Sequence, residues 1–365
     1  MREGWEYKKL GQVCTSDLGK TLNKSKDRGE LHPYLCSINI LWDKIDLSTL
    51  KQACFEADEQ EKYTVRKGDL LVCEGGDTGR SAIWDRDETI LYQNALHRLR
   101  FHESVSPKFV LFYLMYLKDI GEIDNKYSKG VTIKHLVKKA LLSIPLPIPP
   151  KSTQLSIVSE LDKLNELIRI KKEQLKDYDA LAQSIFYEMF GDPVENEKGW
   201  EVKKFGELFK LKSGDGLSSK DFKTGVYPVY GGNGISGYHD SFNMNGDYII
   251  IGRVGVYCGN VRKVSGKFWL TDNAFKLIYH QKEQVSVFIL YLLNILNLHQ
   301  YANAAAQPVI SNLTLKYVNI ILPPLSLQQS FAQKIEQIEQ QKATIQKTIT
   351  DLETLLAARM QYWFD

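Results

Sequence analysis

Pro149-Pro150-Lys151-Ser152-Thr153-Gln154 is the stretch that decides the fold, because it returns 174 residues later as Pro323-Pro324-Leu325-Ser326-Leu327-Gln328. The same spacing then holds without a gap to the pair Phe190 and Phe364. In each copy an apolar, strand-like run leads into the two prolines, and a double proline ends a strand. The chain is therefore expected to contain two copies of one structural plan.

Each double proline is followed by the pattern of a long helix, over residues 153–190 and 327–364. Ser152 and Ser326 are the expected N-caps, since a serine oxygen can accept a hydrogen bond from the first helical turn. Apolar residues recur at 3-4 spacing in both segments, which predicts a coiled-coil seam with the other copy as the partner helix. The seam residues are Leu161, Leu164, Ile168, Leu175 and Ile185 in the first helix and Ile335, Ile338, Ile345, Ile349, Leu352 and Leu356 in the second.

Lys171 and Lys342 interrupt the seam. A polar residue in a seam can fix the register of two helices, whereas a lysine at a frayed edge has no such role. The sequence leaves both interpretations open. Charged residues fill most other helix positions, so the remaining faces are expected to be solvated or to contact polar partners.

The repeat extends over both halves of the chain. In chain order, residues 4–11 match 199–206, 68–72 match 246–250, 94–96 match 273–275, and 109–111 match 288–290. The offset falls from 195 to 174, so the first half carries about 21 extra residues, mostly before Gly68. Each half is expected to hold a turn-rich region with short strands, an apolar helix (near 107–118 and 284–298), the strand that enters the double proline, and the long helix.

The composition is that of a folded globular protein with about two domains. The chain has 365 residues, of which 43% are hydrophobic and 25% charged. Its five cysteines form no CxxC pair, so neither a disulfide framework nor a thiolate zinc site is expected, and the cytoplasm is the expected compartment. No signal peptide is expected, and the longest apolar run, residues 287–298, is too short to span a membrane. A net charge of +3 permits an anionic partner without requiring one.

No stretch of the sequence has the complete pattern of a catalytic or cofactor site. Residues 232–237 match Gly-x-Gly-x-x-Gly, but a strand-like run follows instead of a helix, so an exposed glycine-rich loop is expected. Residues 75–81 resemble a phosphate-binding loop, with Glu74 and Arg80 where that motif needs glycine and lysine. The seven histidines have no metal-ligand spacing, and no Gly-x-Ser-x-Gly elbow occurs. Neither a metal site nor a catalytic residue is expected.

What remains is a set of polar loops rich in glycine, tyrosine and basic residues, densest over residues 212–239 and 253–267. Lysine and arginine contact phosphates, while arginine, asparagine, glutamine and tyrosine can also read or stack on bases. Ordinary solvated loops are the alternative for any single residue, and Asn94 and Asn273 fit a turn as well as a recognition role. The candidate DNA-binding residues are Lys20, Lys24, Lys26, Arg80, Tyr92, Asn94, Lys129 and Thr132 in the first half and Lys212, Ser213, Lys220, Tyr230, Asn233, Tyr238, Arg253, Tyr257, Arg262, Asn273 and Gln307 in the second.

Over essentially its whole length the sequence resembles the specificity (S) subunits of type I restriction–modification enzymes. The resemblance rests on the two half-repeats, each with Pro-Pro-x-x-x-Gln and a long heptad helix, and on the junction Met189-Phe190-Gly191-Asp192-Pro193. The second half is similar to the family's target-recognition domains through residues 227–234, 251–255 and 271–274. The first half departs from that pattern, since residues 74–77 read Glu-Gly-Gly-Asp in place of Gly-Arg-x-Gly. This departure implies a recognition domain of another subtype with a different target.

The resemblance implies an α+β fold. Two tandem α/β target-recognition domains with curled sheets would be separated by an antiparallel coiled coil of two long helices, with pseudo-twofold symmetry. The implied domains are target-recognition domain 1 at residues 1–150, long helix 1 at 151–191, target-recognition domain 2 at 192–324 and long helix 2 at 325–365.

The resemblance also implies DNA recognition without catalysis. Each recognition domain would read one half of a bipartite, asymmetric site in the major groove of double-stranded DNA, and the coiled coil would set the gap and dock two modification subunits. Those subunits carry S-adenosylmethionine and methylate adenine after flipping it from the duplex. Two restriction subunits, with ATP and magnesium, can join such a complex. No cofactor is expected on this chain itself, and no membrane is expected as a partner.

Two other classes of protein compete with this interpretation. A complete methyltransferase would need a cofactor loop and an Asn-Pro-Pro-aromatic motif, and tight binding of S-adenosylmethionine by the isolated chain would favour it. A coiled-coil scaffold that binds no DNA would explain the helices but not the duplicated loops. A function insensitive to salt would favour the scaffold, because phosphate contacts make affinity fall steeply with salt.

The helix length gives a first prediction about the gap between half-sites. A helix of about 38 residues is about 57 Å long, which covers at most about 17 base pairs of DNA. Inserting one heptad into one or both long helices is therefore expected to lengthen the gap in the methylated motif or to abolish methylation. An active variant with an unchanged gap would contradict a role of the helices as a ruler.

Overall fold

The computed structural model describes residues 4–23, 28–130, 134–280, 285–303 and 307–365. The chain divides into two compact units. The first unit contains residues 1–171 and 347–365, and the second contains residues 172–346. Each unit therefore holds one α/β region together with one half of each long helix.

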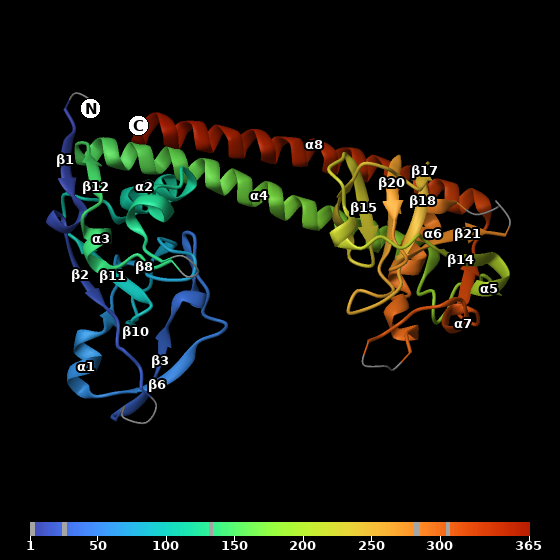
Figure 1. Cartoon of the computed structure of the whole chain (residues 1–365), viewed down its shortest axis with the longest axis horizontal. Helices are drawn as coiled ribbons and strands as arrows, with labels where there is room; N and C mark the ends of the chain where they lie inside the picture. The colour runs from blue at the N-terminus through green and yellow to red at the C-terminus, as the bar shows by residue number, and fades with distance from the viewer. Residues whose placement is uncertain (1–3, 24–27, 131–133, 281–284, 304–306) are drawn as a thin grey trace. The chain divides into compact units, whose positions relative to one another are not determined.

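The two long helices are α4 (Lys151–Phe190) and α8 (Leu325–Phe364) (Figure 1). They are confirmed, but each begins directly after its double proline. The carbonyl groups of Pro150 and Pro324 accept the first helical hydrogen bonds, from Gln154 N–H at 3.0 Å and Gln328 N–H at 3.2 Å. A residue in this position needs no N–H of its own, which is why proline is tolerated there.

The expected N-cap roles of Ser152 and Ser326 are therefore wrong, because both serines lie inside the first helical turn. The N-cap position belongs to the second proline of each pair. A cap without a side-chain acceptor leaves the first N–H groups to other partners.

In the first unit the beginning of α4 packs against the end of α8. The carboxylate of Glu160 accepts hydrogen bonds from the guanidinium of Arg359 and, at 3.1 Å, from the indole of Trp363. Farther along α4, Leu164 lies in the same surface hollow as Leu355. Because residue numbers rise along α4 while those of their partners fall along α8, these two half-helices run antiparallel.

In the second unit the end of α4 packs against the beginning of α8. The rings of Phe186 and Phe190 contact the ring of Phe331, with centroid separations of 5.7 and 5.3 Å. The ammonium of Lys342 lies 2.7 Å from the carboxylate of Asp179 on α4. Lys342 thus forms an ion pair between the helices, and the order of contacts is again antiparallel.

Every residue of the predicted seam is buried or partly buried. Leu161, Ile168, Ile335, Ile338 and Ile349 have less than one tenth of their surface exposed. Burying a leucine or isoleucine side chain stabilises the folded state by about 1.5–3 kcal/mol. The helix pair is therefore held mainly by apolar packing, with ion pairs at its edges.

Within the described residues, the first unit has two four-stranded sheets in the orders β2-β11-β8-β9 and β6-β3-β10-β7, a two-stranded sheet β1-β12 and a hairpin β4-β5. The strands are β1 (Glu6–Lys9), β2 (Cys14–Leu18), β3 (Glu30–Leu35), β4 (Ile40–Leu41), β5 (Lys44–Ile45), β6 (Lys51–Phe55), β7 (Thr64–Val65), β8 (Leu70–Cys73), β9 (Ser81–Ile83), β10 (Ile90–Tyr92), β11 (Leu96–Phe101) and β12 (Pro145–Ile148). Its shorter helices are η1 (Leu10–Gln12), η2 (Ser37–Asn39), α1 (Ala57–Lys62), α2 (Pro107–Asp119), η3 (Ile123–Tyr127) and α3 (Lys138–Leu142).

The second unit repeats this plan, with the described residues forming sheets in the orders β14-β21-β18-β19, β16-β15-β20-β17 and β13-β22. The strands are β13 (Glu201–Lys204), β14 (Phe209–Ser213), β15 (Tyr227–Gly231), β16 (Gly234–His239), β17 (Met244–Asn245), β18 (Tyr248–Gly252), β19 (Val261–Val264), β20 (Lys267–Leu270), β21 (Ala274–Tyr279) and β22 (Asn319–Leu322). Its shorter helices are α5 (Phe205–Leu208), η4 (Ser219–Asp221), α6 (Ser286–Ile295), η5 (Leu298–Tyr301) and α7 (Asn312–Leu315).

The strand orders show which parts of the two units correspond. In both, the second four-stranded sheet contains one parallel pair, β3 with β10 and β15 with β20. The outer strand β6 is separated from β3 by residues 36–50, which carry the hairpin β4-β5, whereas β16 follows β15 after the two-residue turn Gly232-Asn233. Much of the extra length of the first half therefore lies in the segment 36–50 that carries this hairpin, which is before Gly68 as expected.

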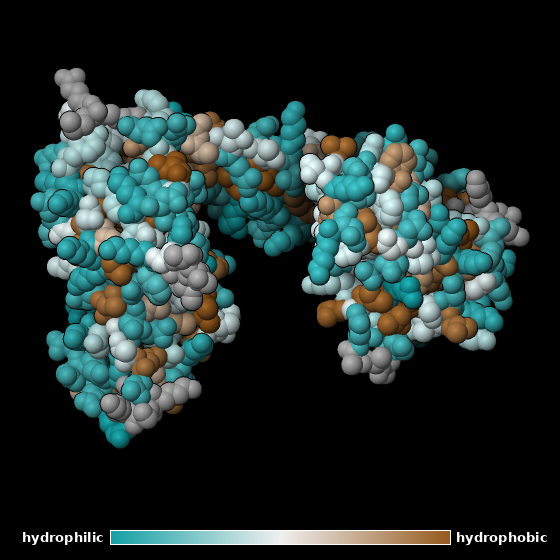
Figure 2. Space-filling view, viewed as in Figure 1, coloured by the Kyte–Doolittle hydropathy of each residue, from teal (hydrophilic) through white to brown (hydrophobic). Residues whose placement is uncertain are grey.

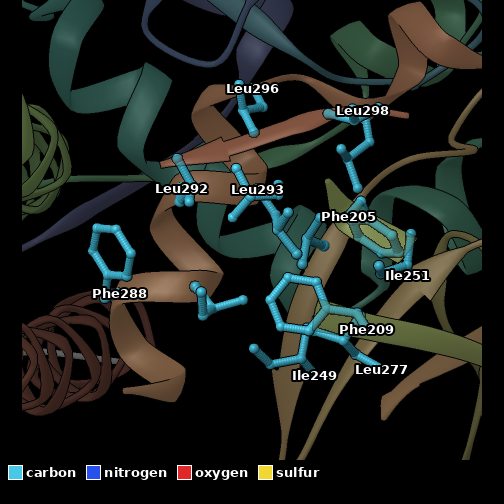
Figure 3. Packing of buried hydrophobic residues seen from close by; sticks show 14 of the residues in the cluster. Phe205, Phe209, Ile249, Ile251, Leu277, Phe288, Leu292, Leu293, Leu296 and Leu298 are labelled. Carbon is cyan, nitrogen blue, oxygen red and sulfur yellow. The ribbon is translucent and has the colours of Figure 1, made fainter. Parts of the chain in front are cut away.

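One apolar helix covers the sheet in each unit. In the second unit Leu292 and Leu293 of α6 lie in one buried cluster with Phe209 and Ile249 of the sheet (Figure 3). In the first unit Phe109 of α2 is fully buried and contacts the ring of Phe364 at the end of α8, with centroids 5.5 Å apart. In the part of the chain that the structure describes, no helix is both long and apolar enough to cross a membrane.

A buried glutamine joins each long helix to its own α/β region. The side-chain oxygen of Gln154 accepts a hydrogen bond from the N–H of Ser106 at 2.8 Å. Its amide nitrogen donates to the carbonyl groups of Ser104 at 3.0 Å and Pro149 at 2.9 Å. Since Ser106 is the N-cap of α2, the amide satisfies a backbone group at the start of a second helix.

Gln328 repeats this arrangement in the second unit. Its side-chain oxygen accepts from the N–H of Val285, the N-cap of α6, at 3.0 Å, and its amide nitrogen donates to the carbonyl of Pro323 at 2.9 Å. The two glutamines are 1% and 3% exposed. The recurrence of glutamine four residues after the double proline thus has a structural cause.

Replacing Gln154 with alanine is expected to lower the free energy of unfolding by about 2–4 kcal/mol, because it leaves several buried backbone groups without partners at about 1–3 kcal/mol each. Chemical denaturation of the full chain measures the loss. Gln340→Ala is the matched control, since Gln340 is exposed on α8. Equal stability of the two variants would contradict this role for the Gln154 amide.

Candidate nucleic-acid interface

Loops that are far apart in the sequence meet in the second unit. The N–H of Arg253, just after β18, donates to the carbonyl of Asn273, just before β21, at 2.9 Å. The carbonyl of Arg253 accepts from the N–H of Ile310 at 2.9 Å, and the N–H of Gly255 donates to Pro308 at 3.0 Å. Residues 231–234, 252–257, 271–273 and 307–310 are called the second-unit loop cluster below.

Close backbone approach explains why this cluster is rich in glycine. A methyl group on Gly252 would lie 2.6 Å from the carbonyl oxygens of both Gly232 and Tyr257. A methyl group on Gly232 would lie 3.1 Å from the carbonyl oxygen of Asn273. The Gly-x-Gly-x-x-Gly stretch opens no helix, as expected, but the expected exposed loop is only the two-residue turn at 232–233, because residues 234–237 belong to β16.

Polar side chains surround a groove in the cluster. Asn233 and Asn273 are exposed, and both line a groove of about 460 Å³. Ser218, Ser219 and Thr271 line the same groove. The arrangement offers hydrogen-bond donors and acceptors around a surface open to solvent, which suits base edges and phosphates.

Two arginines of the cluster region are held in place. The guanidinium of Arg253 lies over the ring of Phe275, 5.4 Å from its centroid, and donates to the carbonyl of Asp272 at 3.3 Å. The guanidinium of Arg262 lies against Gly234, since a methyl group there would be 2.7 Å from its Nη1. Both side chains are accessible at the surface, so each can present its donors without a large loss of conformational freedom.

The loop that carries Tyr257 is held in place by a contact between Cys258 and His299. The sulfur of Cys258 lies 3.2 Å from the Nδ1 of His299, and the same nitrogen is 3.0 Å from the carbonyl of Cys258. Burial raises the pKa of the Cys258 thiol, which keeps it neutral at physiological pH. Tyr257 itself is 50% exposed and is available for stacking.

Three further predicted residues of the second unit, Lys212, Ser213 and Lys220, lie beside the cluster, and Gln307 belongs to it. The hydroxyl of Ser213 donates to the carbonyl of Asp272 at 3.4 Å, and Lys212 precedes it on β14. Lys220 follows Ser219 of the groove, and Gln307 precedes Pro308. All except Ser213 are exposed.

Tyr230 and Tyr238 lie elsewhere in the unit. The ring of Tyr230 packs edge-on against Phe268 with centroids 5.4 Å apart, in a small buried cluster, so its observed contacts belong to the core. Tyr238 is 55% exposed and pairs with Pro228 beyond the β15–β16 turn. The structure does not bring either side chain into the groove lining.

In the first unit, two predicted residues lie in the core. Lys20 is 4% exposed, and its ammonium contacts the carboxylate of Glu59 at 2.6 Å and the carbonyl of Cys54 at 2.8 Å. Tyr92 is fully buried, and its hydroxyl donates to the carbonyl of Asp17 at 3.2 Å. Both side chains have structural partners in this conformation, which the sequence pattern did not reveal.

The other first-unit candidates are nearer the surface. Arg80 donates to the carbonyl of Ser37 at 3.0 Å and so ties the β8–β9 loop to the segment between β3 and β6. Asn94 donates to the hydroxyl of Thr21 at 3.2 Å, which fits a turn role. Lys129 has an exposed side chain. Lys24, Lys26 and Thr132 lie outside the described residues.

The sequence match of Asn94 with Asn273 is wrong by one residue. The N–H of Gly19 bonds to the carbonyl of Leu96, and the equivalent N–H of Gly214 bonds to that of Ala274. Counting back from these strand starts, Asn273 corresponds to Ala95. The same dipeptide, Asn-Ala, occurs in both halves but one position apart in the structure. The backbone hydrogen bonds, and not residue identity, show which positions are equivalent.

The first unit forms its own loop cluster with the same connections. The N–H of Glu74 donates to the carbonyl of Ala95 at 2.9 Å, and the carbonyl of Glu74 accepts from Leu136 N–H at 2.7 Å. His135 forms bridges with both Gly75 and Lys129. Residues 74–75, 93–95, 129–130 and 134–136 are called the first-unit loop cluster. Burial raises the pKa of Glu74, and His135 acts in the opposite direction.

The groove-lining residues Ser218, Ser219 and Thr271 were missed from the sequence. A serine or threonine in a glycine-rich loop has no periodic pattern that separates a lining position from a solvated one. Only the convergence of distant loops identifies them. Within the described residues, no group of three or more His, Cys, Asp or Glu side chains is placed to hold a metal ion.

On the face in view, both units mix hydrophilic residues with apolar patches (Figure 2). Such a surface is typical of a protein that binds a polar ligand, and it does not form a large apolar binding patch. Each unit thus combines one loop cluster, its own sheets and one half of each long helix.

Residues 2–177 and 197–354 match the family model for the type I restriction modification DNA specificity domain, and the chain belongs to that family. The EcoprrI specificity subunit of a type I restriction enzyme from Escherichia coli is 28% identical over 258 residues, which are 67% of this chain and 63% of the relative. A putative type I specificity subunit from Mycoplasma pneumoniae is 26% identical over 200 residues, 53% of this chain and 82% of the relative. The chain thus spans less than two thirds of the length of the E. coli protein that it matches.

Solved structures share the fold over nearly the whole chain. The S subunit of a type I restriction-modification system from M. genitalium has a TM-score of 0.57 at 17% identity, covering 99% of this chain and 96% of that chain. A chain from a study of complex assembly and conformational transition of the type I R-M system has a TM-score of 0.64 at 18% identity, covering 100% and 98%. At these identities the likeness shows the fold alone, with two α/β regions and two packed long helices.

Gly252→Ala is expected to destabilise the second unit by about 1–3 kcal/mol, because the added methyl group must push two backbone carbonyl groups apart. Gly216→Ala is the matched control, since a methyl group there meets nothing within 4 Å. Chemical denaturation compares the two variants. If Gly252→Ala is as stable as Gly216→Ala, the close backbone approach in the cluster is not a constraint.

Proposed function

We propose that this chain is the DNA specificity subunit of a type I restriction–modification complex. Each loop cluster reads one half of a bipartite, asymmetric site in double-stranded DNA. The paired helices set the gap between the half-sites and dock two modification subunits. The chain acts in the cytoplasm and catalyses nothing itself.

The observation that carries this proposal is the convergence of separate loops into one polar surface in each unit. In the second unit Asn233, Arg253 and Asn273 come from three loops that meet through backbone hydrogen bonds and close glycine contacts. Arginine pairs with guanine and asparagine with adenine in the major groove. A rigid surface of this kind can discriminate bases, because its donors are fixed before binding.

The chemistry is supplied by partners. The modification subunits carry S-adenosylmethionine and methylate adenine in the recognised site. Restriction subunits, where they join, use ATP and magnesium. This division of labour agrees with a sequence that has no complete catalytic or cofactor motif.

The test is methylome sequencing of a host that expresses the chain with its neighbouring modification subunit. The wild-type complex is expected to methylate adenine in a motif of two short half-sites around a fixed gap. Arg262→Ala is expected to reduce discrimination at one or two base pairs of a single half-site, by about tenfold or more, as for the loss of one contact to a base edge. Asn233→Ala is expected to affect the same half-site.

Lys263→Ala is the matched control. Lys263 follows Arg262 on β19, carries the same charge and lines hollows beside Tyr248 and α6, away from the groove. Its loss is expected to leave the motif unchanged. If the assembled wild-type complex yields no bipartite motif, the proposed function is wrong and a scaffold role gains support.

A further inference from the structure

Backbone hydrogen bonds make Glu74 the first-unit counterpart of Arg253. The N–H of Glu74 donates to the carbonyl of Ala95, just before β11, at 2.9 Å. The N–H of Arg253 donates to the carbonyl of Asn273, just before β21, also at 2.9 Å. The carbonyl of each accepts from a buried apolar residue, Leu136 at 2.7 Å or Ile310 at 2.9 Å.

The next residue along the chain continues the match. Gly75 forms an antiparallel bridge with His135, and Val254 forms one with Val309. The chain therefore follows the same path through both loop clusters at this point. The side chains of Glu74 and Arg253 leave the backbone at equivalent positions, although one is acidic and the other basic.

Glu74 has no structural task that accounts for its charge. It is partly exposed, and apart from the electrostatic effect of nearby His135, its carboxylate has no hydrogen bond or ion pair with a residue that the structure describes. Neighbouring acidic residues do have such tasks, since Asp77 and Asp124 each lie 2.9 Å from the ammonium of Lys118 on α2. That ion-pair network holds the loop that follows Glu74, so the loop is fixed while the Glu74 carboxylate is left available.

We propose that Glu74 and Arg253 are matching specificity-determining residues that read base edges of opposite hydrogen-bonding polarity. A guanidinium only donates hydrogen bonds and an ionised carboxylate only accepts them. In the major groove, arginine pairs with the acceptors of guanine, whereas glutamate accepts from the amino group of cytosine. The first unit therefore selects cytosine at the place in its half-site where the second unit selects guanine. This inference rests on the proposed function.

The test compares Glu74→Gln with Arg253→Gln in the complex of the full chain with its modification subunit, again by methylome sequencing. Glutamine is close in size to glutamate but is neutral and can donate as well as accept. Glu74→Gln is expected to reduce discrimination about tenfold or more at one base pair of one half-site. Arg253→Gln is expected to do the same in the other half-site.

Glu103→Gln is the matched control, because Glu103 is an exposed glutamate beyond the opposite end of β11 from Ala95. It is expected to leave the motif unchanged. A wild-type bipartite motif that Glu74→Gln leaves unaltered would overturn this inference while the proposed function stands. Complete loss of methylation by an assembled Glu74→Gln complex would also overturn it, since a neutral substitute would then do more than remove one base contact. Absence of any wild-type motif would instead count against the proposed function.

Discussion

The buried amide at the start of each long helix is the interaction on which the rest of the structure depends. Gln154 and Gln328 each bond the carbonyl of the first proline and the backbone at the start of the sheet-covering helix. The direction in which a long helix leaves its α/β region is therefore fixed by groups that cannot be left unpaired without a cost of about 1–3 kcal/mol each. Each α/β region thus has a defined attachment to its own half of the helix pair.

The two units share their framework and differ in their loops. The strand orders, the parallel pair in one sheet and the glutamine bonds recur, while a hairpin in one unit replaces a two-residue turn in the other. This separation has a physical basis: framework residues satisfy buried backbone groups, whereas loop residues face solvent and can change without loss of the fold. The proposed function needs this combination, since the two loop clusters would share one backbone framework but read different half-sites.

Much of the framework could be predicted from the sequence, because it depends on periodicity and repetition. The heptad positions predict the helix seam, and the repeated double proline predicts two copies of one structural plan. The candidate site was less predictable. Lys20 and Tyr92 are chemically suited to nucleic acid but are buried among partners from distant segments, and Asn94 is displaced by one residue from the position that its letters indicate. The burial of these side chains and the position of Asn94 depend on tertiary hydrogen bonds, which produce no pattern in the local sequence. Glu74 appears in the sequence only as part of a departure from Gly-Arg-x-Gly, and only the backbone hydrogen bonds show that it occupies the position of Arg253.

The most direct test of the central claim is made on the DNA rather than on the protein. The complex of this chain with its modification subunits would be assayed for adenine methylation of duplexes that carry the full bipartite motif, either half-site alone, or both half-sites with the gap changed by one base pair. Two readers on one fixed scaffold predict rapid methylation of the full motif only. Equal methylation of a duplex with one intact half-site would contradict the account.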